Sequence, residues 1–183
     1  MLIEEMTSQA SLDLLTRTRL GRLACSLGPQ PYVVPFYFAY QDYSLYSFTT
    51  VGQKIEWMRA NPLVCVEADE VVNSQEWVSV IVFGCYEELA DTPERQSERE
   101  FAWKLLHQYS MWWEPGLAKT ILHGTERPLV PVYYRIRAVR ITGHRATVEP
   151  PDTRLLLLTN AGEGGWLHRI LRLARGKLKR SSF

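Results

Sequence analysis

Residues 32–67 read YVVPFYFAYQDYSLYSFTTVGQKIEWMRANPLVCVE, and this stretch decides the fold. Its first part is rich in aromatic and β-branched residues, which are typical of a packed strand. Its middle part alternates between two faces, and Asn61-Pro62 ends the helical part because proline cannot continue a helix. The stretch therefore predicts a strand at 32–40, a turn at 41–44, a strand at 45–49, a helix from Lys54 to Asn61 and a buried strand at 63–67.

Pro35 lies inside the first of these strands and removes one backbone donor from the ladder. A proline in a strand belongs at an edge, at a bulge, or where the backbone faces something other than a strand. We therefore expect the 32–40 strand to present part of its backbone to a ligand or to solvent.

The end of the second strand offers groups that together bind phosphate. Hydroxyls at Ser47, Thr49 and Thr50 precede Gly52, and Lys54 stands in the first turn of the predicted helix. Hydroxyls, backbone N–H groups, a helix N-terminus and one ammonium would converge there. The same residues also fit an ordinary strand end followed by a solvated lysine, so both interpretations stay open at this point.

The rest of the chain predicts further elements around this centre. Gly84 inside a long strand indicates a bulge or kink, which closed barrels need in order to bend. The predicted elements are a helix from 8 to 16 capped by Thr7 or Ser8, a strand at 18–26, a polar connection at 68–76, a strand at 77–88, a helix from Thr92 toward Tyr109 and a strand at 130–143.

The ordered set of motifs resembles a known family. The motifs are Val34-Pro35, Ser47 to Thr50, Gly52-Gln53-Lys54, Asn61-Pro62 and Trp77-Val78-Ser79-Val80. Over residues 7 to 148 the chain is similar to the FMN-binding split-barrel family that includes pyridoxamine 5′-phosphate oxidase. It looks most like the oxidase-related flavoproteins and nitroimidazole-resistance proteins of that family.

The resemblance implies a mainly β fold with flanking helices, a six-stranded antiparallel split β-barrel, in a cytoplasmic homodimer that binds FMN at the subunit interface. It implies that Lys54 and nearby hydroxyls hold the phosphate, and that the flavin ring lies against the backbone of residues 33–35. The implied cofactor-binding residues are Val33, Val34, Pro35, Ser47, Phe48, Thr49, Thr50, Gln53, Lys54, Trp77, Ser79 and Val80. Arg19 and Arg22 are further candidates for the phosphate, or else belong to a solvated strand end.

The implied activity is flavin-dependent oxidation or reduction of a small molecule. The pyridoxal-phosphate-binding residues of the oxidase have no counterpart here, so pyridoxamine phosphate is not the expected substrate. No catalytic residue follows from the sequence. The alternative is a split-barrel binding module that holds flavin or haem for sensing or storage, without turnover.

Composition and charge divide the chain into a body and a tail. The 183 residues carry a formal net charge of +1, but all six charged residues from Trp166 onward are basic, which leaves the body at −5. General electrostatic binding of nucleic acid is therefore not expected. We predict a barrel domain at 1–148, a linker at 149–165 and a basic amphipathic helix at 166–183. This helix would dock on the body or, less favoured, on a membrane surface.

Other chemistry finds no support in the sequence. The cysteines Cys25, Cys65 and Cys85 lie in apolar runs without metal-ligand spacing, which predicts reduced, buried thiols and no metal site. The four histidines stand in no nucleophile motif, and no glycine-rich nucleotide loop occurs. The aromatic stretch 109–116 would cover the end of a barrel, lie in a dimer interface, or line a substrate pocket.

Overall fold

Strands dominate the computed structural model, which describes residues 1–108, 121–122, 125–126 and 130–148. The main sheet contains β1 (Leu2–Glu5), β2 (Leu20–Leu27), β3 (Gln30–Tyr37), β4 (Ala39–Gln41), β5 (Ser44–Thr50), β6 (Leu63–Asn73), β7 (Glu76–Glu88) and β10 (Pro131–Thr147). The helical elements are α1 (Ser8–Arg17), α2 (Gln53–Ala60), the 3₁₀ turn η1 (Pro93–Arg95) and α3 (Gln96–Leu106). A separate two-stranded ladder joins β8 (Ile121–Leu122) to β9 (Thr125–Glu126).

The main sheet follows the order β3-β2-β6-β7-β10-β5-β4, with β1 added to β10, and every pairing in it is antiparallel. The strands β3 and β4 end this path, yet only Phe38 separates them in the chain. The path therefore curls until its two ends meet, and the Phe38 amide donates a 2.8 Å hydrogen bond to the Arg19 carbonyl at the crossing. This arrangement confirms the predicted mainly β, antiparallel barrel class.

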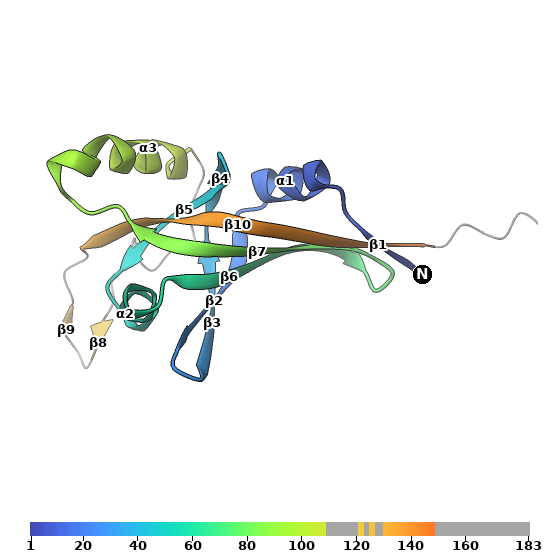
Figure 1. Cartoon of the computed structure of the whole chain (residues 1–183), viewed down its shortest axis with the longest axis horizontal. Coiled ribbons are helices and arrows are strands. Elements are labelled where there is room, and N and C mark those ends of the chain that lie inside the picture. The colour runs from blue at the N-terminus through green and yellow to red at the C-terminus, as the bar shows by residue number, and fades with distance from the viewer. Residues whose placement is uncertain (109–120, 123–124, 127–129, 149–183) are drawn as a thin grey trace, which may run out of the picture. The chain divides into compact units, whose positions relative to one another are not determined.

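Two cores hold the helices against the barrel. The barrel interior receives Leu14 and Leu15 from α1 and Ile55 and Met58 from α2, all fully buried. The second core lies between α3 and the strands β5 and β10, where Leu105 and Leu106 pack with the aromatic side chains Tyr46, Phe48 and Tyr133. Figure 1 shows α1 and α3 on one side of the long β7 and β10 strands and α2 on the other.

Three boundaries differ from the sequence predictions. The single strand predicted at 32–40 is two strands, and the polar connection predicted at 68–76 shrinks to a turn around residues 73–76. Residues 68–71 are strand because each pairs with a residue of β7, from Ala68 opposite Val80 to Val71 opposite Trp77. Strand β1 was not predicted. This strand and the division at Phe38 together raise the number of strands in the main sheet above the expected six.

A β-bulge lies at Gly84, where the sequence predicted a bulge or kink. The extra residue of the bulge belongs to β10, the strand that pairs with β7 at this point. Gly84 pairs with Ala138 while Phe83 pairs with Arg140, so Val139 of β10 has no partner on β7. A Cβ atom at Gly84 would come within 2.5 Å of the Ile136 Cγ2 and 2.8 Å of the Arg137 carbonyl oxygen. The glycine therefore lets the two strands approach at the bend.

The helix predicted from Thr92 begins as the 3₁₀ turn η1 and ends as α3 at Leu106, before Tyr109. The aromatic stretch 109–116, the predicted linker 149–165 and the basic tail 166–183 lie outside the described residues. Among the described residues no helix is both long and apolar enough to span a membrane.

Candidate functional site

The start of α2 combines a glycine N-cap with a lysine in the first turn. Gly52 is the N-cap residue and makes no side-chain capping bond, and Lys54 lies in the first turn. The first amides of a helix have no partner within the helix, and the helix dipole gives them a partial positive charge. The α2 start therefore has the glycine, helix N-terminus and lysine on which the predicted phosphate site depends.

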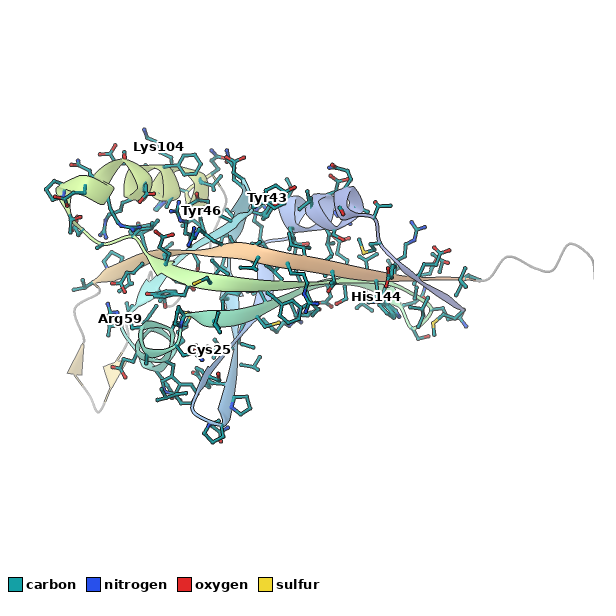
Figure 2. All side chains as sticks on the ribbon, viewed as in Figure 1. Cys25, Tyr43, Tyr46, Arg59, Lys104 and His144 are labelled. Atoms are coloured by element: carbon teal, nitrogen blue, oxygen red, sulfur yellow. The ribbon has the colours of Figure 1, made fainter. Side chains whose placement is uncertain are left out.

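The packing of α2 places Lys54 beside the strands β2 and β3. The Trp57 ring of α2 lies 5.4 Å from the Tyr32 ring of β3. Burial raises the pKa of the Cys25 thiol in β2, and the positive charge of Lys54 opposes this rise. Because Cys25 pairs with Tyr32 and Ala24 pairs with Val33, Lys54 lies close to the strand that carries residues 33–35. Figure 2 shows Cys25 and Arg59 on the α2 side of the sheet and Lys104 on the α3 side.

Strand β3 has one open edge. It pairs with β2 alone among the described strands, so the backbone groups on its other edge are not part of a ladder. Pro35 therefore lies on an edge strand, as its missing N–H predicted. The Val33 side chain is 59% exposed, whereas Val34 is half-buried against the core. The open edge can accept a planar group that carries donors and acceptors on its rim.

The hydroxyls of β5 divide between the barrel interior and its rim. Ser47 and Thr49 are buried, and the Ser47 hydroxyl donates a 2.7 Å hydrogen bond to the Tyr37 carbonyl. Phe48 points to the other face and stacks with Tyr133 at 5.3 Å between ring centroids. Thr50 is half-buried at the strand end, next to the loop that leads to exposed Gln53. Thr50 is therefore the β5 hydroxyl best placed to reach an anion at the α2 start.

The three candidates on β7 lie apart from this group. Strands β2 and β6 separate β3 from β7, which places β7 about 14 Å from β3 at the usual strand spacing. The Ser79 hydroxyl donates a 3.0 Å bond to Glu67 on the outer face of the sheet, and Val80 is fully buried in the core. Trp77 is half-buried opposite Val71. These residues and the β3 edge are therefore three strands apart along the sheet.

The two arginine candidates have other partners. Arg22 pairs with Asp69 and Glu67 on the outer face of the sheet, and Arg19 donates to the carbonyls of Thr16 and Thr18. The described part of the chain contains no cluster of residues with metal-ligand geometry. Cys25, Cys65 and Cys85 are free thiols.

Sequence reasoning missed a polar network that anchors α2. The Arg59 guanidinium donates two 2.7 Å bonds to the Glu88 carboxylate, which also accepts a 2.9 Å bond from the Tyr86 hydroxyl. The hydrogen bonds from Arg59 lower the pKa of Glu88. Arg59 on α2 and Glu88 on β7 are 29 residues apart in the sequence, so no local pattern indicates their contact.

This antiparallel barrel, with an open strand edge and a lysine at a helix start, has the architecture of a split-barrel protein. The chain belongs to the pyridoxamine 5′-phosphate oxidase family, whose sequence pattern matches residues 7–145.

Relatives support this membership over most of the chain. The protein RA0666 of Rhizobium meliloti (strain 1021) is 35% identical over 146 residues, which are 80% of this chain and 97% of that protein. A solved FAD-binding protein from Mesorhizobium loti is 40% identical with a TM-score of 0.66, over 81% of this chain and 99% of that one. A 5-nitroimidazole antibiotic resistance protein from Bacteroides thetaiotaomicron shares the fold at 18% identity and a TM-score of 0.57, over 79% of this chain and 89% of that one.

Proposed function

We propose that this protein binds FMN and acts as a flavin-dependent oxidoreductase on a small molecule in the cytoplasm. The position of Lys54 carries the proposal, because it combines an ammonium with the first amides of α2, close to the open β3 edge. The 40% identical Mesorhizobium loti protein, which is described as FAD-binding, supports a flavin as the ligand. Free thiols at all three cysteines fit a reducing compartment.

The residues present fit a flavin phosphate and ring. Lys54, the first amides of α2 and the Thr50 hydroxyl would hold the phosphate through charge-assisted hydrogen bonds. The backbone of residues 33–35 would bind the rim of the ring. When bound, the flavin supplies the hydride or electron chemistry, and the protein orients it and keeps its environment fixed.

The identity of the flavin is decided by release and analysis. The proposed site offers one lysine and one strand-end hydroxyl, which suit the terminal phosphate of FMN. The proposed contacts include none for the adenosine half of FAD. We expect denatured protein to release FMN, or apoprotein to bind FMN more tightly than FAD. Release of FAD would overturn the choice of FMN and leave the flavin site standing, whereas failure of both flavins to bind would overturn the site.

The phosphate role of Lys54 has a direct test. We expect Lys54→Gln to weaken FMN binding by about tenfold to a hundredfold, the usual worth of a charge-assisted contact. Lys104→Gln is the matched control, because Lys104 is exposed on α3 and on the other side of the sheet. Equal FMN dissociation constants for the two variants would remove Lys54 from the phosphate site. Urea unfolding of both variants checks that neither loses its fold.

A homodimer completes the proposed site. The residues on β7 lie about 14 Å from the β3 edge of the same chain, so a second copy must supply Trp77 and Ser79 if they are to approach the flavin. The outer face of β2, β3, β6 and β7 is suited to this contact. Val33, Ala24, Cys65 and Phe83 form one continuous row across the four strands.

Turnover distinguishes the oxidoreductase from a storage or sensing module. A flavin bound for catalysis is reduced by a donor and reoxidised by an acceptor in many cycles. Anaerobic addition of NADH or NADPH to the FMN-loaded protein, followed by a small-molecule acceptor, measures this cycle by the bleaching and return of the flavin absorbance. A flavin that no donor reduces would favour the binding module.

A further inference from the structure

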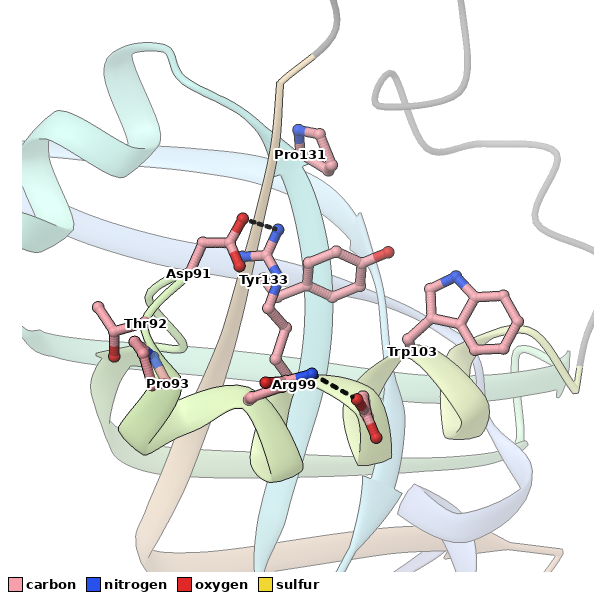
Figure 3. Close-up of a pocket in the computed structure, with 9 residues that line it drawn as sticks. Asp91, Thr92, Pro93, Arg99, Trp103, Pro131 and Tyr133 are labelled. Carbon is pink, nitrogen blue, oxygen red and sulfur yellow. Dashed lines mark hydrogen bonds and ion pairs between the residues drawn. The ribbon is translucent and has the colours of Figure 1, made fainter.

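A cavity lies beside α3. It measures about 590 Å³ and is bounded by α3, by residues 91–93 and by the first residues of β10 (Figure 3). Tyr133 of β10 forms part of its wall and pairs in register with Phe48, whose side chain also faces α3. No residue of α2 lines the cavity, so Lys54 is not part of its wall, although Pro131 of the wall pairs with Thr50 of the proposed phosphate site.

One guanidinium is fixed in this cavity with a loosely held counter-ion. The Arg99 guanidinium carbon lies 4.9 Å from the centroid of the Tyr133 ring, and Nη1 donates a 3.3 Å bond to the Leu89 carbonyl. Its ion-pair partner is Asp91 at 3.7 Å, beyond hydrogen-bond distance, with a side chain that is 87% exposed. The Arg99 side chain is only 22% exposed, and its contacts with the Tyr133 ring and the Leu89 carbonyl hold the guanidinium in the cavity.

Aromatic rings form the walls on both sides of this charge. The Trp103 ring of α3 remains 49% exposed and stacks at 4.4 Å on His107, which holds the indole in place. Tyr133 is braced from behind by Phe48 at 5.3 Å. A fixed, half-exposed tryptophan and a fixed guanidinium provide a stacking surface and a carboxylate anchor within one cavity.

We infer that this cavity binds a flat aromatic monoanion, with a carboxylate on Arg99 and the ring against Trp103. The ligand carboxylate would take the place of Asp91, which is too far away to form a hydrogen bond and too exposed to be retained strongly. A cation is disfavoured because it would face the Arg99 guanidinium. A phosphate dianion is disfavoured because Asp91 and Glu100 both lie in the wall.

Three probes of the same size separate charge from ring stacking. They are 2-naphthoate, the neutral 2-naphthamide and the cationic 2-naphthylmethylammonium, each titrated into the full-length protein by calorimetry. We expect 2-naphthoate to bind about tenfold or more tightly than the amide, because a bidentate contact with arginine is lost in the amide. Equal binding of the acid and the amide, or tighter binding of the cation, would overturn the inference.

Two substitutions should act in opposite directions. Arg99→Gln should weaken the binding of 2-naphthoate by about tenfold, to the affinity of the amide. Asp91→Asn should strengthen the binding of 2-naphthoate several-fold, because it removes the competing carboxylate. Asp91 is largely exposed, so Asp91→Asn tests the inference even if Arg99→Gln fails to fold. Unchanged or weaker binding of 2-naphthoate to Asp91→Asn would count against the anchor.

Trp103→Leu should weaken the binding of 2-naphthoate and of 2-naphthamide by the same factor, since both probes carry the naphthalene ring that stacks on Trp103. Lys104 lies next to Trp103 in the sequence but outside the cavity wall, so Lys104→Gln should leave both affinities unchanged.

The flavin proposal is tested independently of this cavity. Lys54→Gln should bind 2-naphthoate as the unmodified protein does, so failure of the flavin proposal does not decide this one.

Discussion

Gly84 shows how much one missing side chain contributes to the barrel. A Cβ atom added at Gly84 would lie 2.5 Å from the Ile136 Cγ2 and 2.8 Å from the Arg137 carbonyl oxygen. Because backbone cannot move aside without shifting a strand, we expect Gly84→Ala to lower the free energy of unfolding by about 1–3 kcal/mol, the usual cost of overpacking. Urea unfolding at neutral pH measures the change.

Gly52→Ala is the control for this substitution. Nothing lies within 4 Å of a Cβ at Gly52, and its φ of −175° is extended backbone that any residue adopts. We expect this variant to differ from the unmodified protein by under about 1 kcal/mol. If both variants lost the same stability, crowding at Gly84 would not be the cause.

Glu87 gives a prediction for pH dependence. Its pKa is lowered by the hydrogen bond from Arg135 at 2.9 Å, and next by the bond from Arg95 at 2.7 Å. A lowered pKa means that the carboxylate stabilises the fold above its unfolded pKa of about 4.3 and loses this contribution as pH falls through the lower folded pKa. Glu87→Gln should therefore cost about 1–3 kcal/mol at pH 7.

The cost of Glu87→Gln should shrink as the medium is acidified below pH of about 4.3, because the unmodified protein then protonates the same group. Urea unfolding of both proteins across the acid range measures the difference directly. Glu70 and Glu88 also have lowered pKa values, and they remain in both proteins, so they cancel in the comparison. A difference that stays constant with pH would exclude Glu87 as an acid-sensitive contact.

At the scale of single elements, α1 depends on its cap. The Thr7 side chain accepts a 3.2 Å bond from the Ala10 amide at the first turn, as the sequence predicted in naming Thr7 or Ser8. We expect Thr7→Ala to lower the free energy of unfolding by about 1 kcal/mol. Thr16→Ala is the matched control, since its exposed hydroxyl only bonds back to the Leu12 carbonyl and its loss should cost much less. Equal costs for the two variants would contradict the capping role.

Local chemistry explains which elements were predictable from the sequence. The cap of α1, the Asn61-Pro62 stop of α2 and the glycine at the bend are each set by nearest neighbours or a single residue. Residues 68–71 include the acidic pair Asp69 and Glu70, and they are strand because β7 pairs with them. The break at Phe38 likewise follows from where the barrel closes, with the Phe38 amide bonded to Arg19 far away in the sequence. Long-range pairing of this kind leaves no local pattern.

The site divides in the same way. The α2 start and the β3 edge were predicted from motifs whose residues are close in the chain, and the packing of Trp57 on Tyr32 brings them together. Strand alternation gave the face of Ser47 but could not predict that its hydroxyl donates to the Tyr37 carbonyl. The cavity with Arg99 and Trp103 requires the register of β10 against β5, which no motif encodes.

At the scale of the whole molecule, the proposed dimer depends on one outer face of the barrel. Val33 is 59% exposed and Leu63 68% exposed, and Phe83 lies in the same cross-strand row as Val33. None of the described helices packs its buried residues on this face; those residues lie in the barrel interior or in the α3 core. A stable interface would cover roughly 800 Å² on each partner, and a flat sheet face of this kind can supply that area.

Leu63→Lys should therefore turn the dimer into a monomer without unfolding it. Leu63 is mostly exposed in one chain, so a lysine there costs the fold under about 0.5 kcal/mol but places like charges against each other across a two-fold interface. The control is Val139→Lys, since Val139 is 78% exposed at the β10 bulge, beside Ser8 and Leu12 of α1. Light scattering at micromolar concentration should give a monomer for Leu63→Lys and a dimer for Val139→Lys.

Because the second copy supplies Trp77 and Ser79 in the proposed site, the Leu63→Lys monomer should also bind FMN more weakly. A monomer that keeps its full FMN affinity would show that one chain holds the flavin alone, and a dimer that survives Leu63→Lys would move the interface to another face.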